Sequence, residues 1–211
     1  MAQRNTHLGL LFGRVVGLLR RPRKMRDQMA AEPAPEPAPD REPAPEPEPG
    51  FICTKVEQHA LVEWATEKHG SFIPNGKSRR FQTISQCIDI PPAAHRIRSR
   101  IIGQEGLNEF RAPRLGDFVS HITDGGQIQL HTDPNADDLI HVRFNVFLQL
   151  PVQGGRPIYG GTRLDPLERS YLPCVAGRDP HTCEMVVGPK ARIALSFGFL
   201  VTQEWLAHRG V

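Results

Sequence analysis

Six short β-rich runs, separated by turn sequences, occupy the second half of the chain. They cover residues 118–122, 127–131, 140–150, 158–164, 183–187 and 191–201. Gly, Pro, Asn and Asp cluster between them, for example at Asp124-Gly125-Gly126 and Gly188-Pro189, as is typical of turns. Short strands in such a succession bury their apolar sides by forming two packed sheets.

Helical patterns come before most of these runs. Residues 59–68 place Leu61, Val62 and Trp64 at helical spacing, and Pro91-Pro92 opens a second helical stretch over residues 93–107. A further strand is expected over residues 81–90. We therefore predict a mainly β domain with flanking helices, a double-stranded β-helix (jelly roll), over residues 51–211.

The first 50 residues have a different character. Residues 31–50 repeat Glu-Pro-Ala-Pro units, which cannot bury a core and favour an extended linker. Residues 1–30 form a basic leader, in which apolar side chains at helical spacing precede Arg20-Arg21-Pro22-Arg23-Lys24. Residues 6–26 either form an amphipathic helix that docks on a partner or a membrane surface, or belong to a disordered leader.

Charge and cysteine content exclude several classes of protein. The net charge of +3 arises from the basic leader, and the remainder is close to neutral, so no nucleic acid partner is expected. The four cysteines form no C-x-x-C pair, which argues against a zinc ribbon or a thiol redox motif. No apolar run reaches the roughly 18 residues of a membrane span. A cytoplasmic protein with reduced thiols is the expectation.

Three side chains are candidates for a metal site. His131 and Asp133 are alternate residues of an extended segment and project to the same side, and His181 follows about fifty residues later. Two imidazoles and one carboxylate on one face of an octahedron leave three positions open, which suits Fe(II) that binds a keto acid and O2. An H-x-D tripeptide alone is weak support, because the chain has nine histidines.

The final predicted strand strengthens this hypothesis. Its alternation places Arg192, Ala194, Ser196 and Gly198 on one face and apolar residues on the other. A buried arginine beside a serine on such a strand suits a dicarboxylate, because the guanidinium offers a planar fork to the carboxylate. The alternative is an ordinary surface arginine on an edge strand.

His131-Thr132-Asp133, His181, and Arg192 eleven residues later, followed by Ala194-Leu195-Ser196-Phe197-Gly198-Phe199, together resemble the prolyl-hydroxylase-like branch of the Fe(II)/2-oxoglutarate-dependent oxygenases. The resemblance covers roughly residues 114–201 and includes Arg143-Phe144-Asn145-Val146. It implies that His131, Asp133 and His181 hold iron, with 2-oxoglutarate as cosubstrate and O2 as oxidant.

The resemblance also implies residues for the cosubstrate. Arg192 would bind its distal carboxylate, with Ser196, Asn145 and Arg143 beside it, although Arg143 would equally serve to pair with a carboxylate of the fold. His121 stands where many relatives have a tyrosine that contacts the keto acid. The usual histidine-to-arginine spacing leaves two alternatives open, namely Cys183 in place of His181 and Lys190 in place of Arg192.

The resulting hypothesis is a dioxygenase that hydroxylates a C–H bond of an amino-acid-like, carrier-bound or peptidyl substrate and releases succinate and CO2. The alternatives are a non-catalytic jelly-roll binding module and a cupin-like metalloprotein. Candidate walls for the substrate site are residues 134–139 and 156–169. Asp137 and Asp138 in the first wall fit either a cationic substrate or a solvated turn, and the turn is preferred.

Overall fold

The structure, a computed structural model, describes residues 45–87, 89–113 and 116–210. The expected leader, residues 1–30, lies outside the described residues, and of the expected linker only residues 45–50 are described. Within these three ranges, no helix combines the length and the hydropathy that crossing a membrane requires.

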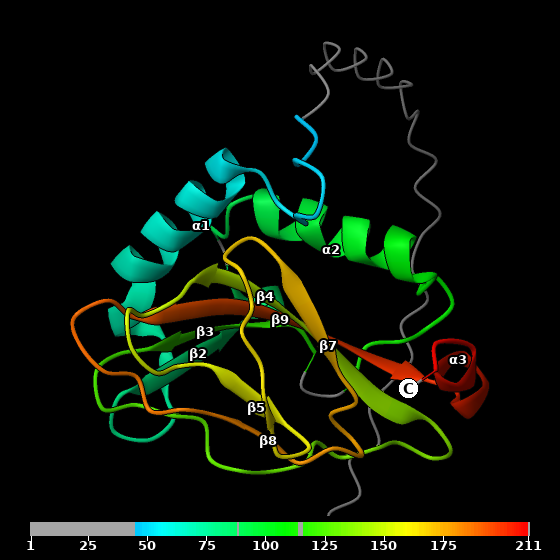
Figure 1. Cartoon of the computed structure of the whole chain (residues 1–211). Helices are drawn as coiled ribbons and strands as arrows, with labels where there is room; N and C mark the ends of the chain where they lie inside the picture. Colours follow the sequence, from blue (N-terminus) through cyan, green and yellow to red (C-terminus); the bar gives the residue numbers. More distant parts are fainter. Residues whose placement is uncertain (1–44, 88, 114–115, 211) are drawn as a thin grey trace, which may run out of the picture. The chain divides into compact units, whose positions relative to one another are not determined.

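A six-stranded antiparallel sheet lies at the centre of the fold (Figure 1). Its strands, in spatial order, are β1 (Ile73–Pro74), β2 (Arg79–Thr83), β3 (Phe118–Ile122), β9 (Arg192–Val201), β4 (Ile140–Gln149) and β7 (Tyr171–Cys174). All ten residues of β9 are buried, because the sheet is covered on both faces.

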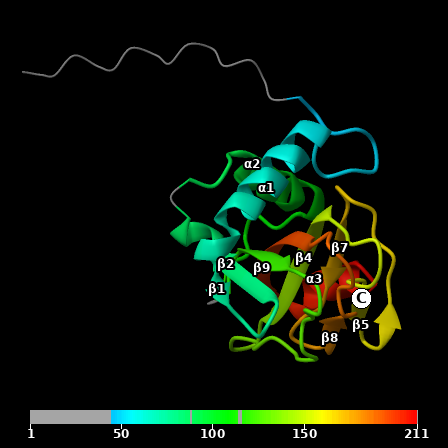
Figure 2. The same ribbon diagram turned by 90° about the vertical axis from the view of Figure 1, so that its left-hand side faces the viewer.

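A smaller antiparallel sheet covers one of these faces. It consists of β6 (Thr162–Arg163), β5 (Pro157–Tyr159) and β8 (His181–Cys183). Residues of β5 and β8 line the same internal cavity as residues of β3, β4 and β9, so the cavity lies between the two sheets. The opposite face of the large sheet carries helices α1 and α2, as Figures 1 and 2 show.

Strand pairing separates a core face from a cavity face. Leu195 lies opposite Val119 in the register, and both belong to the apolar core beneath the helices. The next residue, Ser196, lies opposite Phe118 on one side and Asn145 on the other, and these three line the cavity. Because successive side chains of a strand alternate, one sheet supplies both the core and the polar cavity.

The two long helices have clear end signals. Helix α1 (Lys55–Lys68) begins at a capping box, in which the side chain of Thr54 accepts from the backbone N–H of Glu57 and Glu57 binds the backbone of Thr54. Helix α2 (Ala93–Glu105) ends at Gly106, whose left-handed φ of 65° suits glycine. A short helix, α3 (Gln203–His208), follows β9.

The predicted fold class, mainly β with flanking helices in a jelly roll, is confirmed. The helix expected over residues 59–68 begins four residues earlier, at its capping box. The strand expected over residues 158–164 divides into β5 and β6 at Gly160-Gly161, where both residues have positive φ. Two glycines in this conformation produce the tight reversal of a hairpin.

Other strand boundaries differ more. The strand expected over residues 81–90 is β2, which ends at Thr83 and gives way to a 3-10 helix over Ile84–Gln86. Residues 127–131 form only an isolated bridge at His131, and the strand expected over residues 183–187 is β8, which begins at His181. The short β1, β7 and α3 were not predicted, because they carry too few residues to show a periodicity.

One buried carboxylate joins α1 to α2. Glu57 accepts from Arg96 Nε at 2.9 Å and from Arg100 Nη1 at 2.7 Å. Only 4% of Glu57 is exposed. Replacing Glu57 leaves the largely buried Arg100 without its carboxylate partner, whereas the more exposed Arg96 remains hydrated.

We therefore expect Glu57→Gln to lower the free energy of unfolding by about 3 kcal/mol, the lower end of the range for a buried pair that loses one partner. Glu63→Gln is the matched control, because Glu63 lies exposed on the same helix. Urea denaturation of both variants measures the difference. Equal stabilities would show that Glu57 does not hold the helices together.

Candidate metal centre

His131 and His181 are held side by side by their own backbones. The N–H of His181 donates to the carbonyl of His131 at 2.8 Å, and the N–H of His131 donates to the carbonyl of His181 at 3.2 Å. This antiparallel bridge joins the loop after β3 to the first residue of β8. The two imidazole rings consequently lie with their centroids 4.2 Å apart.

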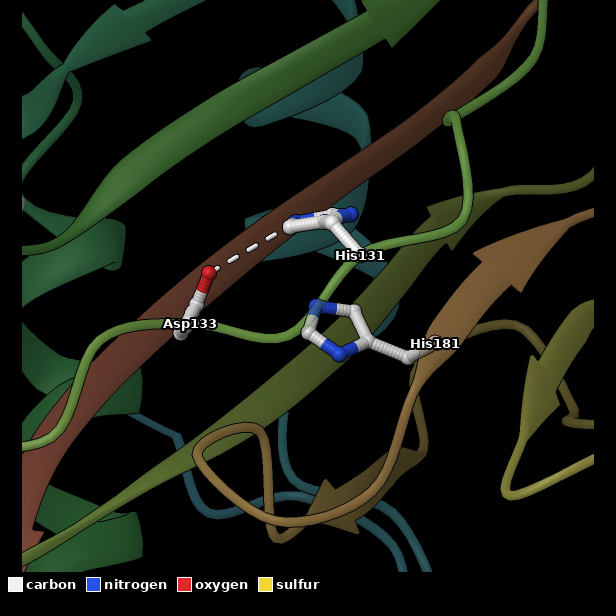
Figure 3. A group of neighbouring side chains, drawn as sticks. All are labelled: His131, Asp133 and His181. Carbon is white, nitrogen blue, oxygen red and sulfur yellow. Dashed lines mark ion pairs between the residues drawn. The ribbon is translucent and has the colours of Figure 1, made fainter.

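The third member, Asp133, is fixed by the same loop. Its backbone N–H donates to the carbonyl of Ala176 at 2.8 Å, which anchors the loop two residues beyond His131. One ligand atom each from His131, Asp133 and His181 lies within 4.8 Å of the others. Figure 3 shows the three side chains converging from two segments of the chain.

Both rings are held through Nδ1, and Nε2 of His131 lies 3.5 Å from Oδ1 of Asp133. Nδ1 of His131 lies 2.7 Å from the carbonyl of Gln129, and Nδ1 of His181 lies 3.2 Å from the carbonyl of Asp179. A carbonyl oxygen only accepts, so each Nδ1 carries the proton in the neutral ring and each Nε2 presents a lone pair. Backbone carbonyls are common partners for metal-binding histidines.

The electrostatics favour an ionised Asp133 and a neutral His181. Burial raises the pKa of Asp133, but hydrogen bonding to His131 and the charge of Arg143 outweigh burial and hold that pKa well below its usual range. Burial lowers the pKa of His181, whereas hydrogen bonding to Asp133 raises the pKa of His131. The cluster therefore offers a carboxylate and imidazoles, the donor set that suits a divalent transition metal.

Two buried side chains, Arg143 and His141, lie beside the carboxylate of Asp133. Arg143 donates through Nε to Oδ2 of Asp133 and through Nη1 to the carbonyl of Gly116. His141 lies with Nδ1 3.5 Å from the same carboxylate oxygen, and burial lowers its pKa to about 4. Of the two roles expected for Arg143, the structure shows pairing with a carboxylate.

A cavity between the sheets opens directly onto this cluster. His131, Asp133 and His181 line this cavity. Four of the five residues expected to bind the cosubstrate line it as well, namely Arg192, Ser196, Asn145 and Arg143. Arg192 is 3% exposed, and its Nε is buried without a hydrogen-bond partner among the described residues. Within the same ranges Arg192 forms no ion pair, so its charge is directed at the cavity without compensation.

Four polar residues that line the cavity were not singled out from the sequence, although Tyr159 lies within the expected wall of residues 156–169. Tyr159 of β5 accepts a hydrogen bond from Asn145 Nδ2 at 2.8 Å, and Arg79, Ser120 and Thr182 contribute polar side chains. Tyr159 comes from the small sheet, whose placement over Asn145 depends on non-local pairing. The sequence could have indicated Ser120, because Phe118 and Ser120 are alternate residues of a predicted strand and therefore share one face of it.

Three sequence candidates lie elsewhere. The ring of His121 packs 4.2 Å from that of His69 on the far side of β3, so the structure does not bring His121 into the cavity. Lys190 forms an ion pair with Glu168 at 2.8 Å. Cys183 packs in a small apolar cluster with Ile122 and Val186. Neither Lys190 nor Cys183 lines the cavity.

An open pocket of about 470 Å³ adjoins the cavity. It shares His131, Asp133, Arg79 and Phe118 with the cavity and is otherwise lined by residues of the segments 75–81 and 125–130. The walls expected at residues 134–139 do not line it, and of residues 156–169 only Pro157 and Tyr159 reach the inner cavity. Asp137 instead pairs with Arg111 at the surface.

The sequence matches no protein-family model and no curated protein. Solved structures are similar to it in fold. The viral collagen prolyl hydroxylase of Paramecium bursaria Chlorella virus-1, in its 2OG complex, superimposes with a TM-score of 0.55 at 14% identity, over 72% of this chain and 94% of that one. The chain has the fold of a prolyl hydroxylase.

Two further structures agree with this fold. A prolyl hydroxylase from Trichoplax adhaerens, in complex with a hypoxia inducible factor peptide fragment, gives a TM-score of 0.55 at 14% identity, covering 75% of this chain and 84% of that one. HygX from Streptomyces hygroscopicus, with nickel and 2-oxoglutarate bound, gives 0.52 at 14% identity, covering 74% and 82%. The fold expected from the sequence resemblance is thereby confirmed.

We expect one equivalent of Fe(II) or Ni(II) to bind, and His131→Ala and His181→Ala to weaken binding by about 100-fold or more, because loss of supporting partners alone costs about 10–100-fold. Cys183→Ser is the control and should bind like the wild type. Equilibrium dialysis with metal analysis measures this. Weakened binding in Cys183→Ser but not in His181→Ala would reassign the third ligand.

Proposed function

We propose that this protein is an Fe(II)- and 2-oxoglutarate-dependent dioxygenase that hydroxylates a C–H bond of a small-molecule or peptidyl substrate. The observation that carries the proposal is the buried, uncompensated Arg192 in a cavity that also contains the His131, Asp133 and His181 side chains. A metal site alone fits many proteins. A metal site that shares its cavity with an unpaired guanidinium fits a metal-bound molecule with a second, distal carboxylate.

The ligand set fits Fe(II). Two neutral imidazoles and one carboxylate form the facial triad of non-haem iron oxygenases, which leaves positions open for other molecules. Bound there with 2-oxoglutarate, the metal would supply the activation of O2. One oxygen atom would enter the hydroxylated product and the other would enter succinate, with release of CO2.

The described residues have distinct parts in this proposal. Arg192 would bind the distal carboxylate of 2-oxoglutarate. Ser196, Asn145 and Tyr159 are the neutral polar groups of the cavity, and Tyr159 is held by the hydrogen bond from Asn145. Burial raises the pKa of Tyr159 above its usual range, so the phenol keeps its proton and remains a donor.

Arg143 would position the carboxylate of Asp133. Its ion pair with Asp133 orients the carboxylate, and Nη1 also lies 3.4 Å from the Oγ of Ser196. The side chain therefore joins the metal cluster to the strand that carries Arg192.

We expect Arg192→Gln to weaken 2-oxoglutarate binding by about 30-fold or more, because removing one partner of a buried charge pair costs about 2 kcal/mol or more. Lys190→Gln removes the same charge two residues earlier, where the side chain pairs with Glu168, and should bind within about threefold of the wild type. Calorimetric titration of the Ni(II)-loaded proteins measures both.

The same titration separates the alternatives. A wild-type protein that binds metal but not 2-oxoglutarate would be a cupin-like metalloprotein, and the proposal would be rejected. A folded protein that binds neither would be a non-catalytic jelly-roll module. Equal losses in Arg192→Gln and Lys190→Gln would show that the distal carboxylate has no single anchor.

A further inference from the structure

Arg79 lies where the inner cavity meets the open pocket. It is the first residue of β2, and its side chain lines both spaces. In the register of the sheet Arg79 lies opposite Ile122, which in turn lies opposite Arg192. Cross-strand neighbours project to the same face, so Arg79 and Arg192 face the same cavity two strands apart.

The guanidinium of Arg79 has no partner among the described residues. It forms no ion pair there, and its Nε is buried without a hydrogen bond. Burial lowers the pKa of the Arg79 side chain, and the nearby charge of Arg192 acts in the same direction. Arg79 is half-buried, and its Nε lies in the buried part without a hydrogen bond, which favours binding of an anion beside it in the functional complex.

The cosubstrate does not provide enough negative charge to balance the site. Arg79, Arg143 and Arg192 with a divalent metal contribute five positive charges. Asp133 and the two carboxylates of 2-oxoglutarate contribute three negative charges, and the histidines are neutral. Two positive charges therefore remain when the proposed site is fully loaded, and an anionic third component is electrostatically favoured.

The lining of the open pocket, like that of the cavity, carries a net positive charge. Lys77 lies at its exposed rim, and Asp133 is the one carboxylate among its described lining residues. The remaining lining offers neutral polar groups from Asn75, Gln127 and Gln129 and an apolar surface from Phe81. Such a wall suits a substrate with a carboxylate at one end and an uncharged body.

We propose that Arg79 binds a carboxylate of the primary substrate and so places its C–H bond beside the metal. This inference rests on the proposed function and narrows the substrate class to carboxylic acids, such as an amino acid or a peptide with a free carboxylate near the reacting carbon. Arg79 binds the substrate, whereas Arg192 binds the cosubstrate.

Trifluoroacetate is a suitable probe, because it is a carboxylate with a fluorine signal. The protein is loaded with Ni(II) and saturating 2-oxoglutarate, and the ¹⁹F line width of trifluoroacetate is followed as its concentration rises. The paramagnetic metal broadens only an anion that binds near it. We expect saturable broadening in the wild type and a dissociation constant about tenfold higher or more in Arg79→Gln.

Three further variants make the result specific. Arg79→Lys keeps the charge and should retain part of the broadening. Arg80→Gln removes one positive charge from the next residue, which bonds to the carbonyl of Phe72, and should behave like the wild type. Arg79→Met keeps the apolar stem and replaces Arg79→Gln should that variant fail to fold.

The possible failures are separable. Calorimetry first establishes that the wild type and the Arg79 variants bind Ni(II) and 2-oxoglutarate alike. No binding in the wild type would overturn the proposed function, and this inference with it. Normal binding of metal and cosubstrate, combined with no broadening in the wild type or equal broadening in Arg79→Gln, would overturn the role of Arg79 alone.

Discussion

Two backbone hydrogen bonds between His131 and His181 hold the two halves of the candidate metal site together. They join the loop after β3, which has little regular structure of its own, to the first residue of the small sheet. Without them, His181 would lose its backbone contact with the segment that carries His131 and Asp133. Each ring is then oriented by a second local contact, from Nδ1 to a carbonyl two residues earlier in the chain. The metal cluster is thus built mainly from backbone geometry, and the side chains complete it.

The large sheet gives this cluster its chemical setting. One face packs Leu195, Phe197 and their neighbours against the helices, whereas the other carries Arg192, Ser196 and Asn145 into the cavity. The apolar face supplies most of the burial that stabilises the fold, and this stability supports a cavity rich in charge. Three guanidinium groups facing one carboxylate would be unfavourable in a closed core. The arrangement is favourable in a site that anionic molecules enter and neutralise.

The sequence predicted what depends on local alternation and spacing. The paired faces of β9, the residues His131 and Asp133, and the fold class were accessible because each follows from periodicity or from a short motif. The position of His121 could not be predicted from the sequence. The fold packs His121 against His69, although the neighbouring Ser120 lines the cavity. The walls of the open pocket and the contribution of Tyr159 depend on how distant segments pair, and no window of sequence reports that pairing.

The most direct test is the visible spectrum of the purified protein mixed anaerobically with Fe(II) and 2-oxoglutarate. A keto acid chelated to iron gives a weak charge-transfer band that neither component gives alone. The account predicts this band in the wild type, its loss in His131→Ala and His181→Ala, and its decay with formation of succinate when air is admitted. A folded protein that binds Fe(II) and yet shows no band would contradict the central claim that metal and keto acid share this cavity.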